Sequence, residues 1–205
     1  MTVRIPGRII PQGTATQPGL PIAGDPNTGF GGDGADALWA IQNAARTWRL
    51  FSDGTQINAS QPCVHARKTA TVTGQTGNQA VATVTFDSEI VDQGADFDGT
   101  TFTAPQACKV LALGQALLNN LTATYVDTSL RFLTSNRDYL PFINIPTSVA
   151  SNIYHVLGGS IIDFDANDTM TMAVRSDRVT ATSLSVDILG STTDNRTSLS
   201  LVVVA

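Results

Sequence analysis

Charge is scarce in this sequence. Lys, Arg, Asp and Glu make up 14% of the 205 residues, whereas soluble domains usually hold about a quarter. The formal net charge is −5, and the cations are scattered along the chain. A protein that binds nucleic acid needs clustered cations to neutralise the phosphates. We therefore expect no nucleic-acid partner.

Long apolar runs and cysteines are scarce too. No stretch approaches the roughly twenty apolar residues of a membrane-spanning helix, which predicts no membrane insertion. Residues 1–11 lack the apolar core and cleavage site of a signal peptide, so we expect synthesis in a cytoplasm. The only cysteines, Cys63 and Cys108, are too few and too far apart for a disulfide scaffold. Two free, buried thiols are favoured over a bridge.

Enzymatic motifs are also missing. The sequence has no G-x-S-x-G, no H-E-x-x-H, no P-loop and no paired-cysteine motif. The only histidines, His65 and His155, form no metal-ligand spacing with the cysteines. His155 lies in an alternating segment where a structural role is favoured, because a general base needs a positioned partner. We expect no catalytic residue and no enzymatic activity.

Thr, Ser, Asn and Gly take the place of the missing charge. Apolar residues alternate with small polar ones in several short runs, clearest at 82–86, 170–174, 184–188 and 199–203. Period-two alternation places one side of a strand in a core, and about eight such runs separated by turn residues predict an all-β sandwich. Residues 109–121 are expected to form a buried central strand rather than a helix. The last strand, 198–204, is expected to be central in its sheet, because an exposed apolar strand invites aggregation.

The N-terminal residues 1–24 are rich in proline and glycine, with four of each. Proline removes backbone donors and glycine adds conformational entropy, so no regular element of useful length is expected here. We interpret this segment as an extended arm that docks onto a partner. Its apolar side chains are the candidate anchors: Ile5, Ile9 and Ile10.

Residues 25–62 predict a small β unit. The segment 25–30 is a dense turn signal, and two short apolar strands follow, one around Trp39 and one around Trp48, closed by the Asp53-Gly54 turn. A unit of this size cannot bury its own apolar side. We expect sister chains to cover the two tryptophans, so that this part forms a short stalk.

Residues 79–205 resemble the jelly-roll domain of the C1q and TNF families. The resemblance rests on Val84–Phe86, the acidic run 92–98, the segment Thr101-Phe102-Thr103-Ala104-Pro105 and the long apolar strand 110–118. It departs from the family pattern in three places: Cys108 stands for a glycine, Val110 for an aromatic residue and Asn167 for the glycine of a turn. The resemblance implies an all-β jelly-roll head over 63–205 that forms a homotrimer.

Residues 24–55, with G-D-P-N-T-G-F and then A-D-A-L, resemble a recurring segment of bacteriophage tail-fibre and other virion-appendage proteins. The two resemblances together imply a trimeric appendage that is made in the host cytoplasm and exposed on the virion. The arm would dock into another virion protein, and the head would bind a host glycan or protein. A capsid decoration, cement or head-fibre protein is the architectural alternative. A cellular C1q-like module is the third reading, weakened by the missing signal peptide.

Two groups of side chains are candidates for contacts in such an assembly. The loop 134–139 has the polar and aromatic composition of a recognition loop, so the candidate receptor contacts are Asn136, Arg137 and Tyr139. Aromatic residues of the stalk and head are candidates for the trimer interface, and they are Trp39, Trp48, Phe142 and Tyr154.

Calcium is the one cofactor that the sequence raises. Asp163, Asp165 and Asn167 match the start of an EF-hand loop. The match then fails, because Asp168 stands at the glycine position and Val174 where a glutamate is needed. A looser calcium site at Asp163, Asp165 and Asp168, or at Asp92, Asp96 and Asp98, stays open. The preferred interpretation is no cofactor, with these aspartates capping turns.

Overall fold

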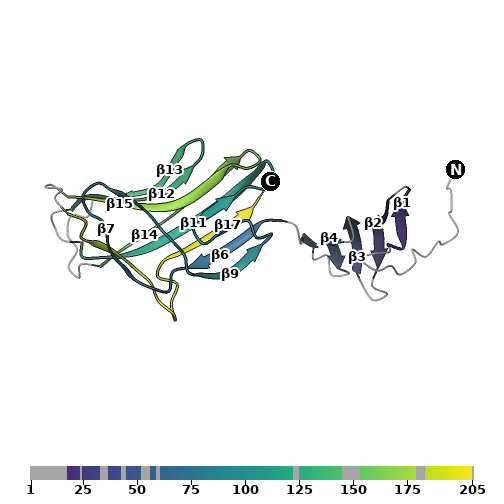
Figure 1. Cartoon of the computed structure of the whole chain (residues 1–205), viewed down its shortest axis with the longest axis horizontal. Helices are drawn as coiled ribbons and strands as arrows, with labels where there is room; N and C mark the ends of the chain where they lie inside the picture. The colour runs from purple at the N-terminus through teal and green to yellow at the C-terminus, as the bar shows by residue number, and fades with distance from the viewer. Residues whose placement is uncertain are drawn as a thin grey trace. The chain divides into compact units, whose positions relative to one another are not determined.

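The computed structural model describes the β-rich parts of the chain, which are residues 18–23, 25–32, 37–42, 45–51, 56–58, 61–121, 125–144, 153–178 and 183–204. All regular structure in these residues is β-strand, as expected. The described residues contain no helix that could cross a membrane. The chain divides into two compact units, Met1–Gln61 and Pro62–Ala205, which we call unit 1 and unit 2 (Figure 1).

Unit 1 holds a five-stranded antiparallel meander in which each strand pairs with the next. The strands are β1 (Leu20–Ile22), β2 (Asp25–Gly32), β3 (Ala37–Gln42), β4 (Ala45–Phe51) and β5 (Gln56–Asn58). β3 and β4 are the two apolar strands predicted around the tryptophans. Residues 1–17, with the three candidate anchors, lie outside the described residues.

Two elements of unit 1 correct the sequence-based expectation. β2 occupies the segment that we expected to be a turn, and β1 lies within the expected arm. Gly29 permits this pairing, because a Cβ at that position would collide with the backbone carbonyl of Leu20 on β1. Pro21 is tolerated because β1 is the edge strand of the sheet, where a missing backbone donor costs little.

Unit 2 is a sandwich of two antiparallel sheets. The first, which we call the β11 sheet, runs in the order β9-β6-β17-β11-β14, with β16 pairing the end of β11 and β7 pairing β16. Its strands are β6 (Cys63–Arg67), β7 (Val72–Thr76), β9 (Ser88–Gln93), β11 (Cys108–Asn119), β14 (Ile153–Phe164), β16 (Val186–Leu189) and β17 (Ser198–Val203). The expected central positions of the 109–121 strand and of the last strand are both confirmed.

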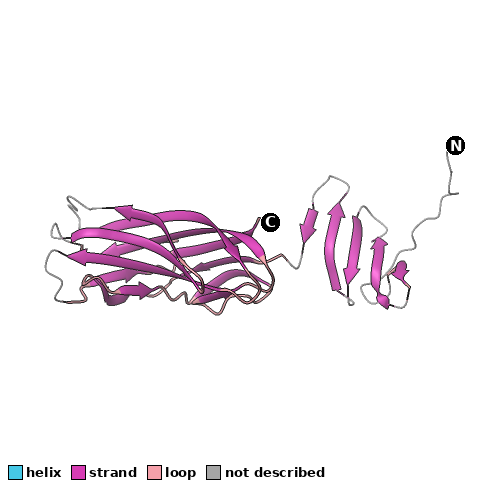
Figure 2. Ribbon diagram, turned by 90° about the horizontal axis from the view of Figure 1, so that it is seen from above, coloured by secondary structure: helices cyan, strands magenta, loops and turns pink. Residues whose placement is uncertain are grey.

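The second sheet, the β15 sheet, runs in the order β10-β15-β12-β13, with β8 also pairing β15. Its strands are β8 (Val81–Thr83), β10 (Thr101–Thr103), β12 (Tyr125–Thr134), β13 (Asp138–Asn144) and β15 (Thr169–Arg178). The long strands of unit 2 run lengthwise beside one another in Figure 2. This arrangement is consistent with a jelly-roll sandwich and confirms the predicted fold class.

The hydrophobic core lies between these two sheets. Alternate residues of β11 are buried, and the side chains of β12 and β15 meet them from the other sheet. Gly114 marks the closest approach: a Cβ there would lie 2.7 Å from Met172 Sδ and 3.0 Å from Phe132 Cε1. Both of those side chains are fully buried. The packing of this layer therefore depends on the missing side chain at 114.

Candidate functional site

β11 and β14 are apolar on both of their sides. On β11 the residues that face the core, such as Val110 and Ala112, alternate with Leu111 and Leu113 on the outward side. β14 shows the same pattern, with buried Val156 and Ile162 interleaved with outward residues that include Leu157 and Ile161. A strand of a two-layer sandwich usually turns a polar side to water. The β11 sheet therefore carries a second apolar surface besides the one in the core.

The strand register assembles this surface into rows. One row runs across four strands through Cys63, Val202, Leu111 and Ile161. The next rows contain His65, Ser200, Leu113 and Gly159, and then Arg67, Ser198, Gln115 and Leu157. We call the outward side of β6, β17, β11 and β14 the head face. Its apolar side chains are well exposed, at 61% for Ile161, 57% for Leu157, 50% for Leu113 and 42% for Val202.

The centre of the head face has no formal charge. No Asp, Glu, Lys or Arg occurs in residues 110–118 of β11, 153–162 of β14 or 198–203 of β17. At one end of the face, Lys109 Nζ and Asp163 Oδ1 form an ion pair of 2.8 Å. The head face is thus apolar and uncharged on β11, β14 and β17, carries Arg67 on β6, and ends at one side in the Lys109–Asp163 pair.

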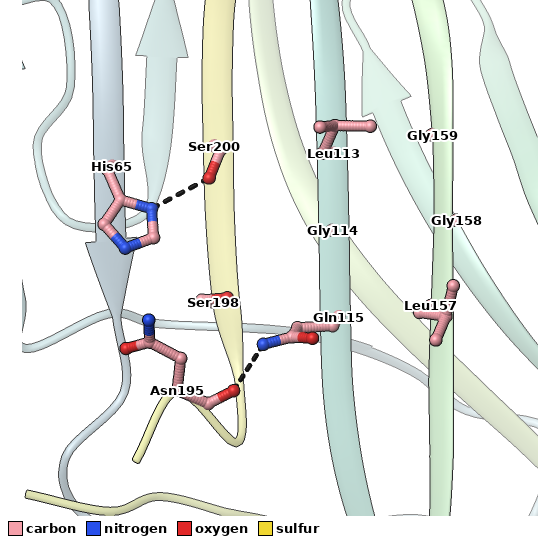
Figure 3. Close-up of a pocket in the computed structure, with 10 residues that line it drawn as sticks. All are labelled: His65, Leu113, Gly114, Gln115, Leu157, Gly158, Gly159, Asn195, Ser198 and Ser200. Carbon is pink, nitrogen blue, oxygen red and sulfur yellow. Dashed lines mark hydrogen bonds between the residues drawn. The ribbon is translucent and has the colours of Figure 1, made fainter. Parts of the chain in front are cut away.

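A hollow of about 460 Å³ lies in the middle of the head face (Figure 3). Leu113 and Leu157 line it with apolar side chains, and Gly159 adds no side chain between them. Polar groups line the other part: His65 Nδ1 lies 2.8 Å from Ser200 Oγ, and Gln115 Nε2 donates to the backbone carbonyl of Asn195. The sequence analysis did not predict this hollow.

The His65–Ser200 pair does not have the arrangement of a nucleophilic centre. A serine nucleophile needs a base that a third group orients, usually a carboxylate. No carboxylate lines the hollow among the described residues. Ser200 lies mid-strand, paired with Leu113 on one side and His65 on the other, so the ladders occupy the backbone groups that an oxyanion would need.

The second candidate site is the hairpin between β12 and β13. Of the three expected receptor contacts, Asn136 and Arg137 lie in its turn and Tyr139 lies at the start of β13. Asn136 and Arg137 are exposed, and the Arg137 guanidinium lies 6.0 Å from the centre of the Tyr139 ring. The Asn136 amide is already engaged, because Nδ2 donates to Asp168 Oδ2 at 2.7 Å. The structure therefore brings the three residues together on one exposed hairpin.

Asp168 braces this hairpin against the turn before β15. Its carboxylate accepts from Ser135 Oγ at 2.7 Å, from Asn136 Nδ2, and from the backbone N–H of Asp165 at 2.9 Å. The hydrogen bond from Ser135, followed by those from Asp165 and Asn136, lowers the pKa of Asp168 below its ordinary value. We call these three bonds the Asp168 brace.

The candidate calcium ligands do not converge. Asp163 is paired with Lys109, and Asp168 is occupied by the brace. The described residues contain no group of three or more His, Cys, Asp or Glu side chains that could hold a metal ion.

The second acidic cluster has a structural explanation. Asp92 accepts from the backbone N–H groups of Asp96 and Phe97, and Asp98 accepts from those of Thr100 and Thr101. Burial, helped by the charge of Asp92, raises the pKa of Asp96. Asp92 and Asp98 therefore cap the turns of this loop.

The aromatic residues that we nominated for the trimer interface lie elsewhere than on the head face. Trp39 is buried within unit 1, with 3% of its surface exposed, and Trp48 is half-buried there. Phe142 and Tyr154 pack against the core of unit 2. The residues that do form the head face were missed, although the two-sided apolar pattern of 109–118 and 153–162 could have indicated it.

Both cysteines are free, as expected. Cys108 is buried, and this burial, together with the charges of Asp163 and Asp96, raises the pKa of its thiol. The expected burial is wrong for Cys63, which is only half-buried because it lies on the outward side of β6, in the first row of the head face.

No protein-family model matches the sequence, and no curated protein matches it. Among solved structures, murine APRIL at pH 8.5 matches with a TM-score of 0.47 and 14% identity over 70% of this chain and 99% of its own. The globular domain of zebrafish complement 1qA protein matches with a TM-score of 0.46 and 12% identity over 71% of this chain and 98% of its own. A similarity at this level carries no information on ligand or partner.

Proposed function

We propose that this chain is a non-enzymatic structural protein of a virus particle, which forms a homotrimer through the head face and displays the β12–β13 hairpin for attachment to the host surface. The observation that carries the proposal is the apolar head face, whose strands β11, β14 and β17 carry no charge between the Lys109–Asp163 pair and the far end of the face. Four of its aliphatic side chains are 42–61% exposed. Contiguous exposed apolar surface of this kind marks an interaction site.

Sister copies of the chain are the proposed partners of the head face. Removal of apolar surface from water favours association, and on β11, β14 and β17 no charge in the centre of the face has to be desolvated. Identical copies meet in closed cyclic symmetry, which leaves no apolar face uncovered. A trimer also presents three hairpins at once, so that weak single contacts add up.

The braced hairpin is the proposed attachment element. Two hydrogen bonds, from Ser135 Oγ and Asn136 Nδ2, join the hairpin to Asp168 before any ligand binds, which reduces the entropy lost on binding. Arg137 and Tyr139 offer a cation and an aromatic ring, suited to a glycan or protein surface. The segment of residues 24–55 that resembles phage appendages, and the apolar arm with Ile5, Ile9 and Ile10, support a place on the virion.

A single charge on the head face tests the assembly. We expect Ile161→Asp to weaken self-association at least tenfold, because each assembled copy would bury an unpaired carboxylate. Ile90→Asp is the matched control, since Ile90 is also an isoleucine on an edge strand, 50% exposed, but lies outside the head face. Sedimentation and light scattering of the full chain over a range of concentrations give the mass. A wild-type chain that stays monomeric throughout would overturn the proposal.

Cys63 provides a local readout of the same event. It lies on the head face, so its reaction with a maleimide should slow as the chain assembles, and Ile161→Asp should restore the fast rate. Equal rates for the wild type and Ile161→Asp at every concentration would count against this face as the interface.

Labelling of intact particles distinguishes a host-attachment protein from a capsid decoration protein. A gold-labelled antibody against residues 63–205 should mark the tail tip or fibres if the head attaches to the host. Label scattered over the capsid would instead favour a decoration protein. No label on any particle would contradict the virion setting while leaving the trimer untouched.

A further inference from the structure

Unit 1 has an apolar surface of its own. The register of its sheet places Leu20, Phe30, Ala40 and Trp48 in one row across four strands. Leu38 and Leu50 form a second row on the same side. We call this side, with these six residues, the stalk face.

The stalk face is exposed, whereas the opposite side of its central strand, β3, is buried. Along β3, Leu38 is 37% exposed and Ala40 half-buried, while Trp39 and Ile41 are only 3% and 2% exposed. Leu20 and Phe30 are 50% and 45% exposed. None of the six residues of the stalk face carries a charge, so only an apolar surface complements it.

The edges of this sheet are poorly suited to adding a strand from another chain. The edge strands, β1 and β5, have three residues each. β1 also contains Pro21, which has no backbone N–H to donate. Short edges and prolines are the devices by which sheets avoid edge pairing. Association of unit 1 is therefore directed to its face.

We infer that the stalk face is a second self-association surface, which packs against the same face of the sister copies. The identity of this occupant rests on the proposed function, because a chain that trimerises through its head brings three identical stalk faces to the same assembly. Identical uncharged faces complement one another without any charge that must be matched. The physical basis of the inference, the two apolar rows of unit 1, is separate from the head.

Tryptophan fluorescence reports on unit 1 alone, because Trp39 and Trp48 are the only tryptophans of the chain. In the full chain carrying Trp39→Phe, the remaining emission comes from Trp48 on the stalk face. We expect this emission to shift to shorter wavelength as concentration rises, with a several-fold loss of acrylamide quenching. Cys63 protection, measured on the same samples, reports on the head.

A charge on the stalk face is the decisive variant. Phe30→Asp should abolish the concentration-dependent change of Trp48 while Cys63 is still protected on assembly. Ala23→Asp is the control, since it adds the same charge to an exposed turn outside the sheet, and it should leave both signals unchanged. An unreactive Cys108 in every variant shows that the head remains folded.

The two readouts separate the possible failures. Cys63 protection without any change at Trp48 would overturn the stalk inference and leave the proposed function standing. Neither signal changing, in a chain whose mass stays that of a monomer, would overturn both. Trp48 shielded equally at every concentration would show that the chain's own residues, such as the 1–17 segment, cover the stalk face, and this too would overturn the inference.

Discussion

Gly114 shows how one missing side chain sets the spacing of the two sheets. A Cβ there meets Met172 and Phe132, which are both fully buried in a close-packed core. We expect Gly114→Ala to lower the free energy of unfolding by about 1–3 kcal/mol, as overpacking usually does. Chemical denaturation of dilute protein measures the change.

Gly159→Ala is the comparison for this prediction. Its added Cβ meets mainly the side-chain end of Leu113, which is half-exposed and able to turn away, and lies 3.1 Å from the backbone oxygen of Ala112. Its effect on unfolding should therefore be smaller than that of Gly114→Ala. Equal losses in the two variants would contradict the role given to Gly114.

The two thiols should differ sharply in reactivity. Burial raises the pKa of Cys108 and removes it from solvent, so little thiolate forms at pH 8 and reagents cannot reach it. In dilute native protein we expect a thiol reagent to modify one cysteine per chain, and Cys63→Ser to remove that reaction. Cys108→Ser should leave it in place. Two fast-reacting thiols in the wild type would contradict the burial of Cys108.

At the scale of elements, the β12–β13 hairpin depends on the Asp168 brace. Because hydrogen bonds lower the pKa of Asp168 in the folded state, its stabilisation is fully present above its unfolded pKa of about 4. It is lost as the pH falls through the lower, folded pKa. We therefore expect the wild type to lose the stabilisation from Asp168 as the pH falls below 4. Asp168→Asn has no carboxylate at this position and should not show this loss.

Chemical denaturation of the wild type and of Asp168→Asn between pH 5 and 2.5 gives the free energy of unfolding at each pH. The slope of this free energy against pH should differ between the two proteins. Asp165→Asn removes a neighbouring exposed carboxylate that makes none of the three brace bonds, and it should keep the wild-type slope. If both variants show the same slope, the carboxylate of Asp168 does not hold the hairpin.

At the scale of the whole molecule, the alternation of apolar and small polar residues was the main basis for predicting the fold. The strands of unit 2 could be placed because small polar residues separate their buried positions, and β11 could be identified as central because residues 110–118 are apolar except for Gly114 and Gln115. β2 could not be predicted, because Asp25-Pro26-Asn27 favours a turn locally, and the pairing of this segment with both β1 and β3 overrides that preference.

The candidate sites were less accessible from the sequence than the fold. The hairpin was found by its composition, but the brace joins residues 135, 136 and 168, which only the tertiary fold brings together. The head face was missed because aromatic residues were preferred for the interface over aliphatic ones. Which side of an apolar strand meets the core depends on register, and the register is set by partners far away in the sequence.

The position of β17 also matters for how the chain is made. β6 is synthesised early, but its neighbour in the sheet, β17, is synthesised much later. The contacting residues His65 and Ser200 are 135 residues apart in the sequence. During synthesis at about 5–20 residues per second, β6 and β11 have no strand between them for several seconds. The growing polypeptide on the ribosome must therefore keep these unpaired edges apart from those of other nascent copies until residues 198–203 emerge.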